Sequence, residues 1–388
     1  MSLPKWPFYE EKQIEAVKNV LSSGKVNKWT GEETGKFEEE FANYHNAKYG
    51  IALSNGSVSL TAAYSAIGIK EGDEIITTPR TFIATSSAAV MLGAKPVFAD
   101  VDFDTGNITS RTIEPLITKK TKAIAVVHLG GWPAEMESIC DLAKKYNLKV
   151  VEDCSQAHGA KIRDISVGSF GDIATWSFCQ DKIISTAGEG GMVTTNNEEY
   201  FNLIWSLKDH GKTLKSLNKA KSNAGFKWVH DNFGTNYRLT ELQSAVGRMQ
   251  LKLLPSWIIT RERNAKILFK SLKEIEALRI PFPEKSLTHA WYKFYAYIDL
   301  KKLRKGWDRD KIIEMINKQG YPAFAGSCSE IYLEKCFINK GIKPNLELIN
   351  AKELGKTSLM FLVHPTIKQN QMEKYALTIK NVIIKAIE

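Results

Sequence analysis

Between residues 48 and 196, short apolar runs alternate with stretches in which apolar residues recur at helical spacing. The runs predicted to form strands are 49–54, 74–78, 96–101, 122–129, 148–152, 174–178 and 191–195. The run at 122–129 is apolar almost throughout, which is typical of a strand buried on both faces. Helices are predicted between the runs. Strands that alternate with helices need crossover connections, so we expect a three-layer α/β/α domain with a mostly parallel sheet.

The pattern changes near residue 250. The later elements are a helix over 251–274 with a start or kink at Pro255, a half-buried strand over 291–298, and helices over 308–319 and 370–387. We therefore predict a large domain over 1–250 and a smaller α+β domain over 251–388. Residues 208–232 are predicted to be a polar loop or insertion.

The composition is typical of a globular protein and indicates the cellular compartment in which the protein works. Hydrophobic residues make up 43% of the 388 residues and charged residues 25%, as in globular proteins. We see no apolar run long enough to cross a bilayer and no signal peptide, which predicts a cytoplasmic protein. The chain has 5 cysteines, an odd number, and none of them form a C-x-x-C pair. Neither a disulfide framework nor a zinc site is therefore indicated.

The net charge is +10, from 53 basic and 43 acidic residues. Such a balance can indicate a polyanionic partner, but the basic residues are dispersed and are densest only over 208–227. A solvated face, or attraction of a small anionic substrate, is therefore favoured over nucleic-acid binding.

Two residues carry candidate chemistry near the ends of predicted strands. Asp153 ends a buried strand, where ligand sites form in parallel sheets, although it could equally serve as a cap or an ion-pair partner. Lys182 lies beyond the strand that ends at Phe178 and precedes a glycine-rich turn. A nucleophilic lysine needs a site that lowers its pKa, and spacing alone favours an ordinary surface lysine.

A series of motifs resembles the sugar aminotransferases of the DegT/DnrJ/EryC1/StrS family. The motifs are TGEETGKFEEEF at 30–41, SNGSVSL at 54–60, GDEII at 72–76, TFIAT at 81–85, EDCSQAHGA at 152–160, SFCQDK at 177–182, GEGG at 188–191 and GTNYRLT at 234–240. Each is weak by itself, but their order and spacing together are specific. The resemblance implies the aspartate-aminotransferase architecture (fold type I) and pyridoxal 5′-phosphate (PLP) as cofactor. No metal is predicted, because the cysteines and histidines show no metal-ligand spacing.

The resemblance also implies roles around the cofactor ring. Lys182 matches the Schiff-base lysine, which also shuttles the proton. Asp153 matches the carboxylate that pairs with the pyridine nitrogen, and Gln156 matches the residue that binds the phenolic oxygen. Phe82 matches the aromatic residue that stacks on the ring; by itself it would be assigned to core packing.

The cofactor phosphate has its own predicted site. Gly56 and Ser57 lie between a strand and a helix, where backbone N–H groups bind anions. They match the family's phosphate contacts, as does Ser177, although Ser57 could also be a plain N-cap. Asn236 matches a residue donated by the partner subunit, which implies a homodimer with shared sites; without the resemblance it would be a turn residue.

Other positions are less decisive. Trp29, Thr30 and Gly31 match a substrate-facing part of the family, but a tight turn before a helix explains them equally well. The residues before Lys182, Cys179 to Asp181, depart from the family's pattern, which affects the wall of the site. His158, His210 and His364 show no metal-ligand spacing and are expected to be structural.

The predicted activity is transfer of an amino group to a nucleotide-linked keto-sugar, with glutamate as donor. The C4 ketone of a 4-keto-6-deoxy sugar is favoured over the C3 ketone. The product would feed surface polysaccharide, such as lipopolysaccharide O-antigen, or a secondary metabolite. Alternatives are an aminotransferase for a cyclitol, a synthase of an aminated aromatic, and a non-catalytic PLP-binding homologue.

Overall fold

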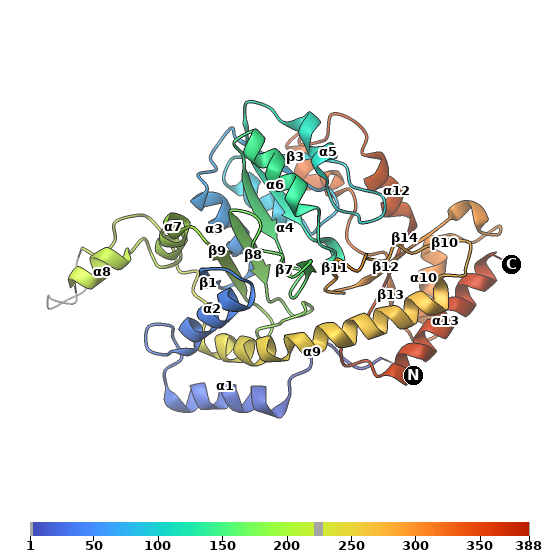
Figure 1. Ribbon diagram of the computed structural model, residues 1–388, viewed down its shortest axis with the longest axis horizontal. Coiled ribbons are helices and arrows are strands. Elements are labelled where there is room, and N and C mark those ends of the chain that lie inside the picture. The colour runs from blue at the N-terminus through green and yellow to red at the C-terminus, as the bar shows by residue number, and fades with distance from the viewer. Residues whose placement is uncertain (1–2, 221–227, 388) are drawn as a thin grey trace.

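The computed structural model describes residues 3–220 and 228–387. Its main sheet has the strand order β1-β9-β8-β5-β4-β2-β3 (Figure 1). The strands are β1 (Tyr49–Leu53), β2 (Glu74–Thr77), β3 (Lys95–Phe98), β4 (Thr121–Val127), β5 (Lys149–Asp153), β8 (Ile173–Ser177) and β9 (Gly191–Thr195). β9 is antiparallel to both neighbours and every other pair is parallel. The prediction of a mostly parallel sheet is confirmed.

Helices cover both faces of this sheet. Both faces are apolar, because successive residues of its strands point into different hydrophobic clusters. Ile76 and Val150 belong to one hydrophobic cluster, whereas their neighbours Ile75 and Val151 belong to another. The surrounding helices are α2 (Glu33–Tyr44), α3 (Gly56–Ala66), α4 (Ala84–Met91), α5 (Ser110–Ile113), α6 (Met136–Lys145) and α7 (Glu198–Lys208). The large domain therefore has the three layers that the alternating pattern predicts.

One long helix links the two parts of the chain. α9 (Glu241–Leu272) lies beneath both sheets in Figure 1, with α1 (Glu11–Ser23) along it. It begins ten residues before the predicted helix, because Thr240 and Gln243 form a capping box there. Pro255 lies inside the helix rather than at its start. The predicted boundary at residue 250 falls within α9, and the division into two domains stays a prediction.

The second sheet is antiparallel and has the order β10-β12-β14-β13. Its strands are β10 (Leu278–Arg279), β12 (Phe294–Ile298), β13 (Ala323–Phe324) and β14 (Ser358–Phe361), and α10 (Arg309–Lys318) and α13 (Gln369–Ile387) cover it. The smaller α+β unit is thus confirmed. The predicted strand at 291–298 begins only at Phe294, since Trp291 has a φ of 49° and turns the chain.

The remaining elements are short. A three-stranded sheet joins β11 (Leu287–Thr288), β6 (Lys161–Ile162) and β7 (Ile165–Ser166). Short helices are α8 (Leu214–Ala220), α11 (Lys335–Asn339) and α12 (Ile349–Thr357), and 3-10 turns occur at Glu114–Leu116, Leu129–Gly131, Leu300–Lys302 and Ile331–Leu333. Ile331 and Leu354 pack into the core of the main sheet, so late segments of the chain complete the large domain.

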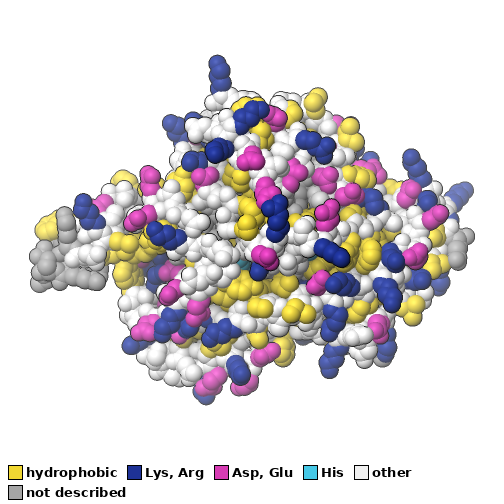
Figure 2. Space-filling view, in the orientation of Figure 1, with side chains coloured by type: hydrophobic (Ala, Val, Ile, Leu, Met, Phe, Trp, Pro, Cys, Tyr) yellow, Lys and Arg dark blue, Asp and Glu magenta, His cyan; other side chains and the backbone are white. Residues whose placement is uncertain are grey.

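The polar stretch predicted over 208–232 contains α8, and residues 221–227 of it lie outside the described residues. Figure 2 shows Lys and Arg side chains spread among Asp and Glu side chains over the visible face. No helix within 3–220 and 228–387 is long and apolar enough to cross a membrane.

Candidate active site

Asp153 is the last residue of β5, and its carboxylate is buried at the carboxyl edge of the main sheet. Its Oδ2 accepts a hydrogen bond from Thr85 Oγ1 (2.8 Å), and its Oδ1 accepts one from the backbone N–H of Ser155 (3.1 Å). Thr85 Oγ1 also lies 3.2 Å from the hydroxyl of Thr81. Two donors therefore fix the orientation of the carboxylate and tie it to the start of α4.

Lys182 lies on the loop after β8, the strand that pairs with β5. Its backbone is held on both sides, because its N–H donates to Cys179 (3.0 Å) and its carbonyl accepts from the indole Nε1 of Trp6 (2.9 Å). The Nζ atom lies 4.9 Å from the centroid of the Tyr292 ring, where a cation is attracted by the ring face. Since β5 and β8 are neighbours, Asp153 and Lys182 follow adjacent parallel strands.

A small charged cluster surrounds Tyr292. Its hydroxyl donates to the carboxylate of Asp181, and the Nζ of Lys293 lies 3.7 Å from the same carboxylate. Burial lowers the pKa of Lys293 to about 8. Although burial opposes it, the charge of Lys182 and the hydrogen bond from Tyr292 lower the pKa of Asp181. Burial, together with Asp181, raises the pKa of Tyr292 well above its ordinary value.

Gly56, Ser57 and Ser177 come together at the N-terminus of α3. Gly56 and Ser57 are the first residues of the helix, where backbone N–H groups have no partner within the helix. A Cβ on Gly56 would lie 2.6 Å from the Cβ of Ser177, so only glycine lets β8 approach so closely. The N-cap is Asn55, whose Oδ1 accepts from Val58 N–H (2.9 Å). The alternative assignment of Ser57 as an N-cap is therefore wrong.

Asn236 is exposed on the segment that runs beside the end of β1. The carbonyl of its neighbour Tyr237 accepts a hydrogen bond from the N–H of Ser54 (2.9 Å), two residues before Gly56. The Oδ1 of Asn236 accepts a weak bond from Arg238 N–H (3.4 Å). The structure thus places this side chain on the surface near the segment that leads into α3.

Gln156 and Phe82 occupy contrasting surroundings. Gln156 is buried, and its Oε1 accepts from the N–H of Gly130 (2.8 Å), which fixes the amide. Phe82 is 68% exposed, so the alternative of core packing is wrong. Its neighbour Thr81 belongs to the hydroxyl pair that leads to Asp153.

The turn at Trp29, Thr30 and Gly31 lies against α7 and α9. The Trp29 ring meets the Trp205 ring edge-on at 6.2 Å between centroids. A Cβ on Gly31 would lie 2.3 Å from a carboxylate oxygen of Glu241, the first residue of α9. The Nζ of Lys212, just beyond α7, also lies 4.9 Å from the centroid of the Trp29 ring, and Thr30 Oγ1 donates to the carbonyl of Asn27 (3.0 Å).

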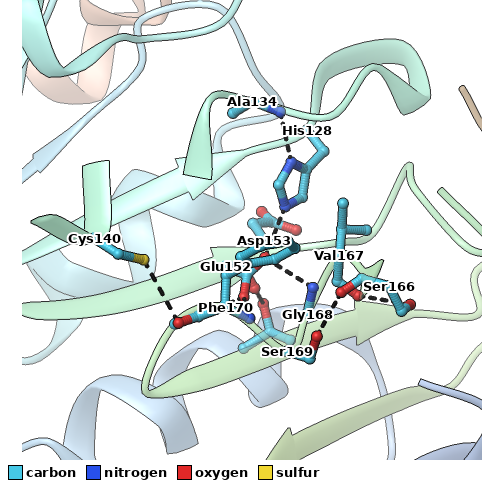
Figure 3. Close-up of polar contacts among 12 residues, drawn as sticks. His128, Ala134, Cys140, Glu152, Asp153, Ser166, Val167, Gly168, Ser169 and Phe170 are labelled. Atoms are coloured by element: carbon cyan, nitrogen blue, oxygen red, sulfur yellow. Dashed lines mark hydrogen bonds and ion pairs between the residues drawn. The ribbon is translucent and has the colours of Figure 1, made fainter. Parts of the chain in front are cut away.

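Glu152 belongs to a separate buried network (Figure 3). Its carboxylate accepts bonds from His128 Nε2 (3.1 Å) and from the backbone N–H groups of Gly168 (2.8 Å), Phe170 (2.9 Å) and Gly171 (2.7 Å). The Nδ1 of His128 accepts from Ala134 N–H (3.0 Å), so the ring proton lies on Nε2 and is donated to Glu152. The Sγ atom of Cys154 lies within 4.8 Å of the ligand atoms of His128 and Glu152, a spacing that could hold one metal ion. The two carboxylate oxygens, however, already accept four donors and hold the 168–171 turn.

The three histidines singled out from the sequence lie apart from one another. His158 is buried among Phe41, Trp176 and Phe178, and burial lowers its pKa well below the ordinary value. His364 accepts from or donates to Thr366 Oγ1 (2.8 Å) and stacks on Trp6. His210 adopts a φ of 58° in the turn after α7.

These residues fit PLP in shape and chemistry. Gly56 and Ser177 pack closely at a helix N-terminus, whose free N–H groups suit a phosphate, and a buried carboxylate and a lysine follow neighbouring strands. The fold and the site therefore define a PLP-dependent enzyme of fold type I, as the motifs predict.

Comparison with known proteins gives the family. Residues 7–380 match the model of the DegT/DnrJ/EryC1/StrS aminotransferase family, and the chain belongs to it. The protein is therefore a PLP-dependent aminotransferase, as the resemblance implied.

Relatives show the same class over most of the chain. An aminotransferase structure from Psychrobacter cryohalolentis is 47% identical, with a TM-score of 0.97 over 100% of both chains. A dTDP-3-amino-3,6-dideoxy-alpha-D-galactopyranose transaminase from Aneurinibacillus thermoaerophilus is 39% identical over 74% of this chain and 75% of its own. GDP-perosamine synthase from Escherichia coli O157:H7 is 37% identical with the same coverage.

Sequence reasoning missed several residues that surround Lys182. Trp6 lies 176 positions away in the chain and binds the carbonyl of Lys182 with its indole N–H. Tyr292 and Lys293 lie inside the half-buried strand predicted over 291–298, and that pattern does not indicate a contact with the lysine loop. The one available signal was the unusual Asp181 beside Lys182, because a carboxylate there needs partners.

Proposed function

We propose that the enzyme transfers an amino group from glutamate to the ketone carbon of a nucleotide-linked sugar, with C4 of a 4-keto-6-deoxy sugar as the favoured position. The observation that carries the proposal is the placement of Asp153 and Lys182 after neighbouring parallel strands in a chain of this family. Two relatives are named for amino sugars linked to GDP and to dTDP. The dispersed net charge of +10 suits a substrate with a diphosphate.

Each residue has a task in this proposal. PLP, when bound, withdraws electrons from the carbon that carries the transferred nitrogen. Lys182 would hold the cofactor, and its ε-amino group would then carry the proton between the two carbons that exchange it. Asp153 would face the pyridine nitrogen and keep it protonated, with Thr85 holding the carboxylate in place.

The remaining residues would bind and orient. The N–H groups of Gly56 and Ser57 and the hydroxyl of Ser177 would hold the phosphate. Gln156 would contact the phenolic oxygen, and the exposed ring of Phe82 would cover one face of the cofactor. The Trp29 to Gly31 turn would contact the sugar nucleotide.

The decisive experiment supplies glutamate with nucleotide 4-keto and 3-keto sugars and follows formation of the amino sugar. Turnover of a 4-keto sugar is expected, and turnover of a 3-keto sugar alone would move the amination to C3. No turnover with any such sugar, but turnover with a cyclitol ketone or an aromatic precursor, would replace the proposed substrate class.

The role of Lys182 has its own test. Lys182→Ala is expected to lower turnover by more than about 1000-fold while the cofactor still binds noncovalently. Borohydride treatment followed by peptide mapping should label Lys182 in the wild type and leave the variant unlabelled. A label on another lysine would contradict the assignment.

We also propose a homodimer in which Asn236 reaches the phosphate of the partner's site. Asn236 is exposed, and Phe233 on the same segment is fully exposed, as expected of a segment that a second copy covers. Mixing inactive Lys182→Ala and Asn236→Ala proteins should restore part of the activity, because one site of each mixed dimer would be intact. Exchanged dimers that stay inactive would indicate that each site is built from one chain.

The cytoplasm is the proposed location, and surface-polysaccharide assembly is the proposed use of the product. All five cysteines are free thiols, which suits a reducing compartment. Fractionation of cells and analysis of their polysaccharide after deletion of the gene would test both.

A further inference from the structure

A cavity of about 730 Å³ adjoins the loop that carries Lys182. One wall consists of the N-terminal segment, including Trp6 and Pro7, and another consists of Gln180, Asp181 and Gly188 from the lysine loop. Lys293, Pro322 and His364 of the smaller unit close the remaining side. The cavity therefore lies where the lysine loop, the N-terminus and the second sheet meet.

The charges at this cavity do not balance. Asp181 is the only acid among the described lining residues, whereas Lys5 and Lys293 are basic. Lys293 Nζ and Lys182 Nζ lie 4.6 and 4.9 Å from the centroid of the Tyr292 ring, so Asp181 faces two ammonium groups. Burial holds the His364 ring neutral, lowering its pKa to about 3.

Arg261 adds a further cation behind the cavity wall that Trp6 forms. Arg261 is 1% exposed, and its guanidinium carbon lies 5.1 Å from the centroid of the Trp6 ring. Its Nη1 donates to the carbonyl of Trp291 (3.1 Å), while Nε and Nη2 have no hydrogen-bond partner among the residues that the structure describes. A buried cation with open donors strengthens the positive field, since an uncompensated charge in a protein interior attracts an anion.

We propose that Lys293, backed by Arg261, forms a subsite for a carboxylate of the amino donor, and that Asp181 restrains its charge. This inference rests on the proposed function, because it concerns the donor of that reaction. The anion must lie close to Lys182, since residues on both sides of Lys182 line the cavity. The α-carboxylate of an amino acid sits one bond from the reacting carbon. The diphosphate of a sugar nucleotide lies across the sugar ring from the ketone and does not meet this requirement.

Calorimetric titration of the holoenzyme with glutarate, an unreactive dicarboxylate, tests the subsite. Lys293→Gln is expected to weaken glutarate binding by about tenfold or more, because it removes a charge near the bound anion. Lys293→Arg should stay within about threefold of the wild type. Lys301→Gln, at an exposed lysine that does not line the cavity, is the matched control and should change nothing.

The opposite substitution gives the sharper test. Asp181→Asn keeps an acceptor for the Tyr292 hydroxyl but removes the negative charge, so glutarate should bind about threefold more tightly or better. A purely structural cluster would make both variants worse. Equal glutarate affinity in wild type and Lys293→Gln, or weaker binding in Asp181→Asn, would overturn the proposal.

The pH dependence supplies another readout. Since burial lowers the pKa of Lys293 to about 8, the wild type should lose glutarate affinity as the pH rises through 8. The groups around Lys293 are Asp181, Lys182, Arg261, Tyr292 and His364. Lys293→Arg should hold its affinity to higher pH than the wild type, until Arg261, whose pKa burial lowers to about 9, loses its charge. Identical profiles would count against Lys293.

Steady-state kinetics separates this inference from the proposed function. In Lys293→Gln the KM for glutamate should rise about tenfold, while kcat and the KM for the sugar change less than about threefold. A wild-type enzyme that uses no glutamate refutes the proposed function. A wild-type enzyme that uses glutamate, with an unchanged KM in Lys293→Gln, refutes the subsite alone.

Discussion

Glu152 and Asp153 are neighbours at the end of β5, and both carboxylates are buried, yet their surroundings differ. Glu152 accepts from His128 and from three backbone N–H groups of the turn at 168–171 (Figure 3). Asp153 accepts from one hydroxyl and one backbone N–H, and lies at the edge where the lysine loop begins. Successive residues of a strand face opposite sides of a sheet. One side of the strand therefore stabilises the fold, while the other presents a carboxylate to the site.

This comparison teaches that burial and charge alone do not identify a functional acid. Lys208 makes the same point among the bases: it is fully buried and burial lowers its pKa to about 7, but it lies in a packed position 3.7 Å from Glu38. For the two neighbouring carboxylates, the useful distinction is whether the donors around the charge already satisfy it. Glu152 is satisfied within the fold, whereas Asp153 keeps room for a partner.

The largest expected effect comes from Asp153→Asn. The amide oxygen can still accept from Ser155 N–H, while the NH₂ group donates to Thr85 Oγ1, whose own proton can turn to the hydroxyl of Thr81. The melting temperature should therefore move by less than about 2 °C. Turnover should fall by about 100- to 1000-fold, because a neutral amide no longer keeps the pyridine nitrogen protonated. Melting curves and single-turnover rates measure the two effects. An unchanged rate would remove Asp153 from the mechanism and erase the contrast with Glu152.

Glu152→Gln should show the reverse pattern. Each carboxylate oxygen accepts at least two donors, so an amide NH₂ would face N–H groups in either orientation. We expect a loss of about 3 kcal/mol in the free energy of unfolding, with the rate per folded molecule within about threefold. Urea unfolding measures it, and Glu137→Gln at an exposed ion pair with Arg163 should cost less than about 1 kcal/mol. A folded, fully stable but inactive Glu152→Gln would reverse the two roles.

The smallest effect tests the support of Asp153. Thr85→Val removes the hydroxyl that donates to Asp153, while Thr85→Ser keeps it. Turnover should fall about three- to tenfold in the valine variant and stay near the wild-type rate in the serine variant, as one hydrogen bond contributes about 1 kcal/mol. If the two variants lose activity equally, the methyl group rather than the hydroxyl matters, and the carboxylate is positioned in some other way.

Much of the large domain could be predicted because its signals are local. The alternating runs predicted every strand of the main sheet within a few residues, since central strands such as β4 are buried on both faces and are largely apolar for that reason. Errors occurred where a local cue outweighed the pattern. The capping box at Thr240 starts α9 early, and the positive φ of Trp291 delays β12.

The motifs, through their resemblance to a family, predicted the residues proposed to hold the cofactor, because these residues lie at fixed offsets from strand ends. They placed Asp181 beside Lys182 but did not predict its partners Tyr292 and Lys293, nor the contact of Trp6 with Lys182. Trp6 and Lys293 come from segments distant from the lysine loop, and no spacing along the chain relates them to it.

The sequence by itself determined where the candidate residues lie relative to the strands and helices. A carboxylate and a lysine follow buried strands, and a glycine begins a helix. The sequence could do so because backbone geometry fixes which residues end a strand or begin a helix. Tertiary structure alone decided that Glu152 is saturated and Asp153 is not, and that excess positive charge gathers at the cavity beside Lys182. Both outcomes depend on which distant groups come within a few ångströms, and only the folded chain sets those distances.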